Sequence, residues 1–332
     1  MLNVAVVGMG HIGNAHARCY QKNKHVKMVA VCDISLERVN AAAKVFNCRP
    51  FGSIRDLLSS GIPIDAVSMT TGGKENGGDH YQATVELLTA GIPVLGEKPI
   101  SNEIPQAREM VALGQAKHVA YAINLNHRFT PAARQAKLWL DQGRLGAINM
   151  IKMTLWINNP NESSPYFHIR ALHPHSIDVL RYFGGDIARV QAFFKKGPGR
   201  NTWSNVLVNL QFANGTLGHL TGSYDAGIGY GLESCDLVGA DGRVVIEEAC
   251  QRLRFQHRHC KEAQVFENLG GMTSADETFQ ARIDAWVEDL LKKTPPEKID
   301  GKAEDALKAQ LVIEAAIESW EKGTVVTVPT LK

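Results

Sequence analysis

The chain has 332 residues, more than one hydrophobic core usually supports, so we expect two domains. Apolar residues make up 44% and charged residues 21%, with a formal net charge of +2 and no long run of one sign. Nucleic-acid and membrane partners are therefore not expected, because they need clustered Lys and Arg or a long apolar span. The six cysteines are scattered, which is typical of reduced thiols in a cytoplasmic protein.

The first part of the chain, residues 1–122, alternates short apolar runs with amphipathic stretches. The apolar runs predict buried strands at 2–7, 27–32, 64–69, 93–96 and 118–123. Helical spacing of apolar residues predicts helices at 11–23, 35–46, 80–90 and 104–116. Strand, helix and strand at this rhythm predict an α/β domain with a doubly wound parallel sheet of the Rossmann type.

The rhythm changes in residues 123–332. Helices are predicted at 131–142, near 173–183, and at 279–293 and 305–322. Strand-like runs occupy 148–157, 190–194, 205–212, 216–224, 233–238 and 243–247. Asn214-Gly215 and Asp241-Gly242 are strong hairpin turns between such runs. We therefore expect an α+β second domain, built on a mostly antiparallel sheet with helices on one side, whose last helices return toward the first domain.

A glycine motif follows the first predicted strand and opens the first predicted helix. Gly8, Gly10 and Gly13 fit G-x-G-x-x-G. They suit a tight turn, close approach of a pyrophosphate, and close packing of helix on strand. The helix N-terminus then offers free N–H groups to phosphates. The alternative is that the glycines serve turns only.

Asp33 ends the second predicted strand, twenty residues after Gly13. A carboxylate there can accept hydrogen bonds from both ribose hydroxyls, and it repels a 2′-phosphate. No arginine follows Asp33 immediately, so NAD is favoured over NADP as the cofactor.

Two further segments carry residues suited to proton transfer. Lys98 follows the predicted strand at 93–96 and is either a solvated loop charge or a group aimed into the cofactor cleft. His175 and Asp178 stand at i and i+3 on one helix face, and His168 and His173 are near in sequence. These histidines could instead be surface or core groups. Metal binding is also possible, but the H-x-H spacing has no Cys or Glu partner, so we expect no metal.

Five motifs taken together resemble the Gfo/Idh/MocA oxidoreductase family. They are the glycine motif from Gly8, Asp33, Glu97-Lys98-Pro99, Asn126-His127-Arg128-Phe129 and His175-Ser176-Ile177-Asp178. The resemblance covers essentially the whole chain. It implies a Rossmann domain joined to an open-faced, mostly antiparallel sheet that forms homodimers or homotetramers. It also implies NAD(P)-linked oxidation of a secondary alcohol on a sugar, sugar derivative or inositol-like polyol.

The resemblance assigns three catalytic residues. Lys98 matches the lysine that hydrogen-bonds the reacting hydroxyl, His175 the general base, and Asp178 the acid that supports the histidine or the substrate. Hydride leaves a carbinol carbon only as the O–H proton departs, so a base that titrates near neutral pH is required. A lysine beside the oxygen stabilises developing alkoxide.

Further residues are expected to line the site. Cofactor contacts are expected from Gly8, Gly10, His11, Ile12, Gly13, Asp33, Ile34, Thr70, Thr71, Asn76, His80, Glu97, Lys98, Asn126 and His127. Substrate contacts are expected from Lys98, His127, Trp156, Tyr166, His168, Arg170, His173 and His175. For Trp156, stacking on a sugar ring competes with core packing. Arg170 would suit an anionic group on the substrate.

Two features depart from the family pattern. Ala171 stands where its sugar and inositol dehydrogenases usually have an aspartate, so either His173 or Arg170 substitutes or the substrate binds differently. The loop at 71–80 is longer than usual and rich in glycine. We expect this loop to lie against the cofactor or toward the substrate; an insertion without ligand contact is the alternative.

Two other functions stay open for this fold. One is a redox-neutral enzyme, in which bound NAD oxidises a ring carbon, a glycosidic bond eliminates, and the cofactor is regenerated. The other is a non-catalytic NAD-binding sensor, which would need neither Lys98 nor His175.

Overall fold

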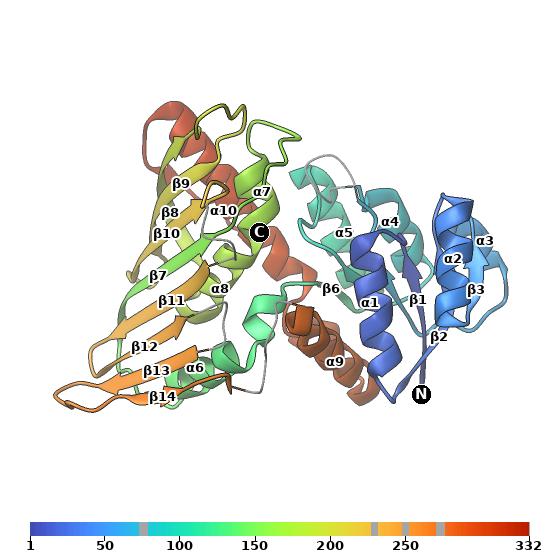
Figure 1. Cartoon of the computed structure of the whole chain (residues 1–332), viewed down its shortest axis with the longest axis horizontal. Coiled ribbons are helices and arrows are strands. Elements are labelled where there is room, and N and C mark those ends of the chain that lie inside the picture. Colours follow the sequence, from blue (N-terminus) through green and yellow to red (C-terminus); the bar gives the residue numbers. More distant parts are fainter. Residues whose placement is uncertain (73–78, 227–231, 248–251, 270–275, 332) are drawn as a thin grey trace. The chain divides into compact units, whose positions relative to one another are not determined.

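The computed structural model describes residues 1–72, 79–226, 232–247, 252–269 and 276–331. The chain forms two compact units (Figure 1). Unit 1 comprises Met1–Asn124 and Phe279–Leu307, and unit 2 comprises Leu125–Thr278 and Lys308–Lys332. Within the described ranges, no helix is long and apolar enough to cross a membrane.

Unit 1 is built on a six-stranded parallel sheet with the strand order β3-β2-β1-β4-β5-β6. The strands are β1 (Leu2–Val7), β2 (Val26–Cys32), β3 (Arg49–Phe51), β4 (Ala66–Met69), β5 (Val94–Gly96) and β6 (Tyr121–Ile123). Val7 at the end of β1 pairs with Cys32 on one side and Met69 on the other. This order is the doubly wound arrangement that the sequence predicts, and it gathers the carboxyl ends of all six strands at one edge.

Helices cover the sheet of unit 1. They are α1 (His11–Lys22), α2 (Leu36–Phe46), α3 (Ile54–Ser59), α4 (Tyr81–Thr89), α5 (Ile104–Lys117) and most of α9 (Asp276–Lys292). Trp286 of α9 is fully buried in one hydrophobic cluster with Val4 of β1 and Tyr20 of α1. The short η4 (Pro296–Lys298) follows α9, and α10 (Ala303–Lys322) begins in unit 1 and continues into unit 2.

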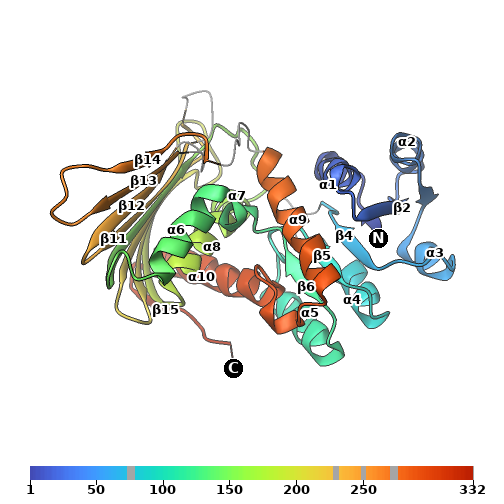
Figure 2. The same ribbon diagram turned by 90° about the horizontal axis from the view of Figure 1, so that it is seen from below.

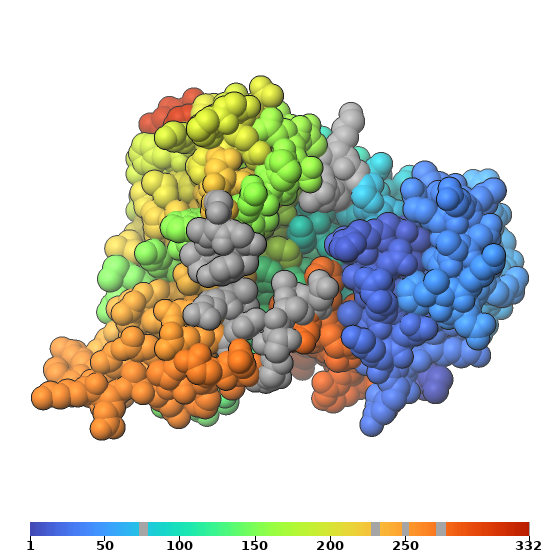
Figure 3. Space-filling model, viewed as in Figure 1, coloured from blue at the N-terminus to red at the C-terminus, as the bar shows by residue number. Residues whose placement is uncertain are grey.

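Unit 2 is built on a nine-stranded sheet with the order β14-β13-β12-β11-β7-β10-β9-β8-β15. The strands are β7 (Ile148–Trp156), β8 (Ile187–Lys195), β9 (Asn205–Phe212), β10 (Leu217–Ser223), β11 (Leu232–Gly239), β12 (Gly242–Glu247), β13 (Arg252–His257), β14 (Gln264–Phe266) and β15 (Val326–Thr327). All neighbours are antiparallel except β7 and β10, which run parallel. The hairpin of β13 and β14, coloured orange, extends from one end of the sheet (Figure 3).

One face of this sheet carries the helices of unit 2, as Figure 2 shows. They are η2 (Asn126–Phe129), α6 (Pro131–Asp141), α7 (Phe167–Leu172), α8 (Pro174–Gly184) and the second part of α10. On the other face, Phe193, Leu207 and Thr221 lie side by side on neighbouring strands. Phe193 and Leu207 are exposed, so this open face is partly apolar.

The structure confirms most of the elements predicted from the sequence, and the differences have a common cause. The strand β3, the helices α3 and α7, and the strands β13 and β14 are not predicted. Each spans only three to six residues, too short for a periodic apolar pattern to stand out. In addition, α7 and α8 are separate helices that meet at His173.

Candidate active site

The glycine motif forms the turn between β1 and α1. Gly8 has a φ of +93°, and a Cβ there would lie 2.6 Å from the backbone nitrogen of Thr71. A Cβ on Gly13 would lie 1.9 Å from the carbonyl oxygen of Gly8, so the helix can approach the strand only with glycine at this position. Gly10 is the N-cap residue of α1, with open space where its Cβ would be. It has no side chain to bond the first N–H groups of the helix. The turn therefore offers backbone N–H groups to an anion.

Asp33 follows β2 and is buried. Its Oδ2 accepts a 2.7 Å hydrogen bond from the backbone N–H of Met9, inside the glycine motif, and its Oδ1 accepts one from Ser35. Arg38 donates to both oxygens, at 2.9 and 3.3 Å. Burial raises the pKa of Asp33, but the bonds from Arg38, Ser35 and Met9 outweigh it and hold the pKa below its usual value. The arginine near Asp33 thus comes five residues later in the chain and pairs with the carboxylate, which stays ionised.

Two threonines after β4 line the same edge of the sheet. The Oγ1 of Thr70 donates to the carbonyl oxygens of Val7 and Gly8, at 2.9 and 2.7 Å. Thr71 and buried His80 share a 2.9 Å hydrogen bond, and burial lowers the pKa of His80 to about 4. The predicted contact Asn76 lies outside the described residues.

Glu97, after β5, is the centre of a buried polar network. One of its oxygens accepts hydrogen bonds from Asn124 at 2.5 Å and from His16 of α1 at 2.9 Å. His16 is also bonded to Ser68, which is bonded to the hydroxyl of Tyr20. Burial raises the pKa of Glu97, but His16 leads the effects that outweigh it and lower the pKa overall. The carboxylate therefore stays ionised in a fixed place beside Lys98.

Lys98 follows Glu97 directly, and its backbone N–H donates to the Oε2 of Glu97 at 3.2 Å. The side chain is half-buried at the carboxyl edge of the sheet, so it is not a fully solvated loop charge. Burial lowers the pKa of Lys98, and the Glu97 carboxylate acts in the opposite direction. His11 and Ile34, also expected near the cofactor, are exposed at the start of α1 and after β2.

In unit 2, two histidines from different elements stack. His175 lies in the first turn of α8 and His127 in η2. Their ring centroids are 4.2 Å apart and the ring planes differ by 6°. The Nδ1 of His127 lies 2.8 Å from the carboxylate of Glu233 on β11, which is buried. His175, His127 and Glu233 thus form one continuous group.

Asp178, one turn after His175, pairs with Arg128. The guanidinium donates through Nε to Oδ2 of Asp178 at 2.7 Å and through Nη2 to Oδ1. Both side chains are at least 95% buried. The pair ties η2 to α8, the two elements that carry His127 and His175.

His168 of α7 and His173, at the start of α8, form a buried pair. Their Nε2 atoms are 3.0 Å apart, and the Nδ1 of His173 is 3.0 Å from the hydroxyl of Ser176. Burial lowers the pKa of His168 to about 3 and places that of His173 well below its usual value. Gly222 of β10 makes room for the pair, since a Cβ there would lie 2.0 Å from the Nε2 of His173. These neutral rings belong to the core of unit 2.

Of the remaining predicted substrate contacts, two form hydrogen bonds elsewhere in unit 2 and one lies on the open face of the sheet. Arg170 forms a two-bond ion pair with Glu314, and Tyr166 donates to Glu321. Trp156 lines a cavity of about 550 Å³ on the open face of the sheet, with Phe193 and Leu207. It thus lies on the opposite face from His173, which meets Gly222.

Asn126, which directly precedes His127 in the chain, is buried and donates a 2.5 Å hydrogen bond to the hydroxyl of Thr278.

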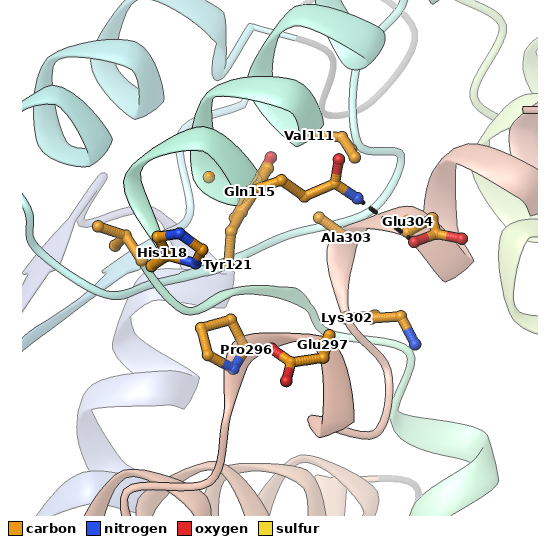
Figure 4. Close-up of a pocket in the computed structure, with 11 residues that line it drawn as sticks. Val111, Gln115, His118, Tyr121, Pro296, Glu297, Lys302, Ala303 and Glu304 are labelled. Atoms are coloured by element: carbon orange, nitrogen blue, oxygen red, sulfur yellow. Dashed lines mark hydrogen bonds between the residues drawn. The ribbon is translucent and has the colours of Figure 1, made fainter. Parts of the chain in front are cut away.

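The described residues contain no group of three or more His, Cys, Asp or Glu able to hold a metal ion. A separate cavity of about 130 Å³ in unit 1, between α5 and the start of α10, contains none of the predicted site residues (Figure 4).

Sequence reasoning missed two pairings of the site, that of Glu233 with His127 and that of Arg128 with Asp178. Glu233 lies 106 positions from His127, and Arg128 lies 50 positions from Asp178. No local pattern links such distant residues. A signal was nevertheless available: Glu233 begins the predicted strand at 233–238 and shares a face with Cys235 and Leu237, and a carboxylate on such an apolar face needs a partner.

Comparison with known proteins gives consistent matches over both units. The family description "Oxidoreductase family, NAD-binding Rossmann fold" matches residues 2–125, and "GFO/IDH/MocA C-terminal domain" matches residues 133–245. The inositol 2-dehydrogenase of Rubrobacter xylanophilus is 26% identical over 345 residues, covering 99% of this chain and 94% of that protein. The inositol 2-dehydrogenase of Rhizobium meliloti is 24% identical over 257 residues, covering 73% and 74%. A levoglucosan dehydrogenase solved with NADH and levoglucosan shares the fold, with a TM-score of 0.88 at 19% identity, over 99% of this chain and 100% of that one.

Proposed function

Because the chain belongs to the Gfo/Idh/MocA family of oxidoreductases, we propose that it is an NAD-dependent dehydrogenase of a secondary alcohol. The alcohol belongs to a sugar, a sugar derivative or an inositol-like polyol. The observation that supports this most is that one chain carries a cofactor turn at Gly8–Gly13 together with two side chains suited to act on a hydroxyl, Lys98 in unit 1 and His175 in unit 2.

The residues of unit 1 fit NAD. Open space at Gly10 and the uncapped N-terminus of α1 suit the pyrophosphate. Asp33, ionised at the end of β2, suits the ribose hydroxyls and disfavours a 2′-phosphate. The proposed cofactor contacts at this edge of the sheet also include Thr70, Thr71, His80, Glu97 and Lys98. In unit 2, Asn126 and His127 are proposed as further cofactor contacts. When bound, NAD supplies the hydride acceptor.

Lys98 and His175 divide the work on the hydroxyl. His175 takes the O–H proton, because a neutral imidazole accepts a proton readily near neutral pH. Lys98 donates a hydrogen bond to the same oxygen and stabilises its developing negative charge. Glu97, fixed by His16 and Asn124, positions Lys98.

In this proposal Asp178 is a positioning residue. Its carboxylate is committed to Arg128, so it fixes α8 against η2 and thereby orients His175. Tyr166, His168, Arg170, His173 and Trp156 support the walls of unit 2 rather than contact the substrate, because each has a partner or a face of its own. Neither Arg170 nor His173 is therefore proposed to replace the aspartate absent at Ala171.

A substrate screen tests the proposal. Monosaccharides, inositols, sugar acids and simple glycosides are incubated with NAD, and NADH is read by absorbance. One class should produce NADH, and His175→Ala should abolish it, whereas His219→Ala, on the open face of the sheet, should not. Absence of NADH, together with cleavage of glycosides and NAD retained by the purified protein, would overturn the dehydrogenase in favour of the redox-neutral enzyme.

We also propose that the chain forms homodimers or homotetramers through the open face of the sheet in unit 2. Exposed apolar patches of this kind mark protein interfaces. Phe193 is 53% exposed and Leu207 45%, and both line the 550 Å³ cavity there. The double change Phe193→Asp and Leu207→Asp should yield monomers in light scattering. An unchanged mass would place the interface elsewhere.

We propose a cytoplasmic location because of the protein's thiols. Among the described residues, Cys32, Cys48, Cys235 and Cys260 have thiols outside any disulfide. Free thiols suit a reducing compartment. Fractionation of the producing cells tests the location, and recovery outside the cytoplasm would contradict it.

A further inference from the structure

His127 has the features of an oriented acid–base group. Its Nδ1 is 2.8 Å from the carboxylate of Glu233, whose side chain is 6% exposed. The ring itself is half-buried, and its Nε2 is not one of the buried polar atoms that lack a hydrogen bond, so this edge of the ring is accessible. Across the described ranges, no residue forms a hydrogen bond with its Nε2. A carboxylate that fixes one nitrogen while the other stays open is the arrangement in which imidazoles exchange protons with ligands.

The stacking with His175 separates the work of the two rings. Imidazole N–H groups and lone pairs lie in the ring plane, so two nearly parallel rings cannot hydrogen-bond each other. The two rings therefore act through separate partners. With centroids 4.2 Å apart, the two rings can serve neighbouring groups on one small molecule.

The carboxylate of Glu233 selects the tautomer of His127. An ionised carboxylate only accepts hydrogen bonds, so a neutral ring must carry its proton on Nδ1. Nε2 is then a lone pair and accepts a hydrogen bond. A hydroxyl group can donate to it, whereas a methyl ether or a deoxygenated carbon cannot.

We propose that Nε2 of His127, oriented by Glu233, accepts a hydrogen bond from the hydroxyl on the carbon next to the one that is oxidised. The site would then require a hydroxyl at that one neighbouring position, a narrower requirement than a secondary alcohol. This inference rests on the proposed function, in which His175 takes the proton of the reacting hydroxyl. It also adds Glu233 as a positioning residue that acts through His127.

Matched substrate pairs test the selectivity. The probes are myo-inositol with both enantiomers of 1-deoxy-myo-inositol, and methyl D-glucoside with its 2-deoxy and 4-deoxy derivatives, so that each neighbour of the reacting carbon is tested. In the wild type, kcat/KM should be lower by about 100-fold for one deoxy member of each set, because the imidazole acceptor is then left without its hydroxyl partner. His127→Ala and Glu233→Gln should reduce this gap to less than about fivefold. Asp236→Asn, also a carboxylate-to-amide change on β11 but paired with Arg243, should preserve the gap.

The protein alone provides a second readout. In long-range ¹H–¹⁵N spectra, with His127 assigned from His127→Ala, its ring should carry its proton on Nδ1 at pH 8. Glu233→Gln should reduce that preference, and Asp236→Asn should not. This measurement does not depend on turnover.

The outcomes separate the inference from the proposed function. NADH from a parent polyol with no gap, or with a gap that persists in His127→Ala, overturns the inference and leaves the dehydrogenase intact. If neither parent yields NADH, the dehydrogenase fails for these substrates, and the spectra decide. A proton on Nε2 then overturns the inference, whereas an Nε2 signal that shifts on addition of either parent, and shifts less with its deoxy derivative, supports it.

Discussion

The carboxylate of Asp178 is held by the guanidinium of Arg128, and both side chains are buried. Breaking such a pair leaves an uncompensated buried charge. Arg128→Met should therefore lower the free energy of unfolding by about 3–5 kcal/mol, measured by urea denaturation. Removing both charges together, in Arg128→Met with Asp178→Leu, should restore much of the loss.

Arg181→Met is the matched control, on α8, the helix that carries Asp178. Arg181 pairs with Asp186, whose side chain is 58% exposed and also pairs with Lys308, so water and Lys308 can stabilise the carboxylate left behind. Its loss should be clearly smaller. Equal losses for the two arginine variants would show that burial of the Asp178 charge is not the cause.

Cofactor choice should respond to Asp33 and Arg38 together. Asp33→Ala removes the carboxylate that repels a 2′-phosphate. It also releases Arg38, which in the wild type donates hydrogen bonds to that carboxylate. The ratio of kcat/KM for NADP to that for NAD should rise by about tenfold or more, equivalent to about 1.4 kcal/mol. Adding Arg38→Ala should remove the gain in NADP use. A ratio unchanged by Asp33→Ala would remove the basis for NAD preference.

Lys98 should affect turnover more than cofactor binding. Lys98→Met should lower kcat by about 10²–10⁴-fold, the range for groups acting on the transition state, while the Kd of NAD from fluorescence titration changes little. Lys137→Met, which removes a lysine that pairs with Asp141 on α6, provides the control. Wild-type kcat in Lys98→Met would refute the assignment.

His80 should make stability depend on pH. Its pKa is about 4 in the folded protein and about 6.5 when unfolded, so the unfolded state binds more protons between these values. The stabilisation is complete above pH 6.5 and is lost as the pH falls toward 4, by about 3 kcal/mol at most. His168 and His173 act in the same direction.

Urea midpoints measured between pH 7.5 and 4.5 test this dependence. His80→Asn should weaken the fall in the free energy of unfolding over that range, whatever its stability at pH 7.5. A pH dependence identical to that of the wild type would show that His80 is not buried in its neutral form.

The first unit was largely predictable because its signals are local. Apolar runs mark its longer strands, and Ser35 caps α2 by accepting a hydrogen bond from the N–H of Arg38, three residues on. The glycine motif and Asp33 also lie within one strand–helix–strand stretch, so their spacing alone predicts a cofactor turn. The strand β3 escaped prediction because it has three residues and includes Pro50.

The polar groups of the second unit were much less predictable. The sequence indicates His175 and Asp178 as neighbours on a helix, but it does not show that Arg128 occupies the carboxylate. Nor does it show that Glu233 orients His127, or that Trp156 faces away from the histidines. Such pairings depend on strand order and on which face of the sheet each helix covers, and these are properties of the assembled fold.

Residues 124–128 connect one polar partner after another along a single short segment. Asn124, Asn126, His127 and Arg128 hydrogen-bond, in that order, to Glu97, Thr278, Glu233 and Asp178. Inserting or deleting one residue here would turn every following side chain away from its partner at once. Length variation among relatives should therefore be absent from this segment and should collect in turns such as the one between β13 and β14.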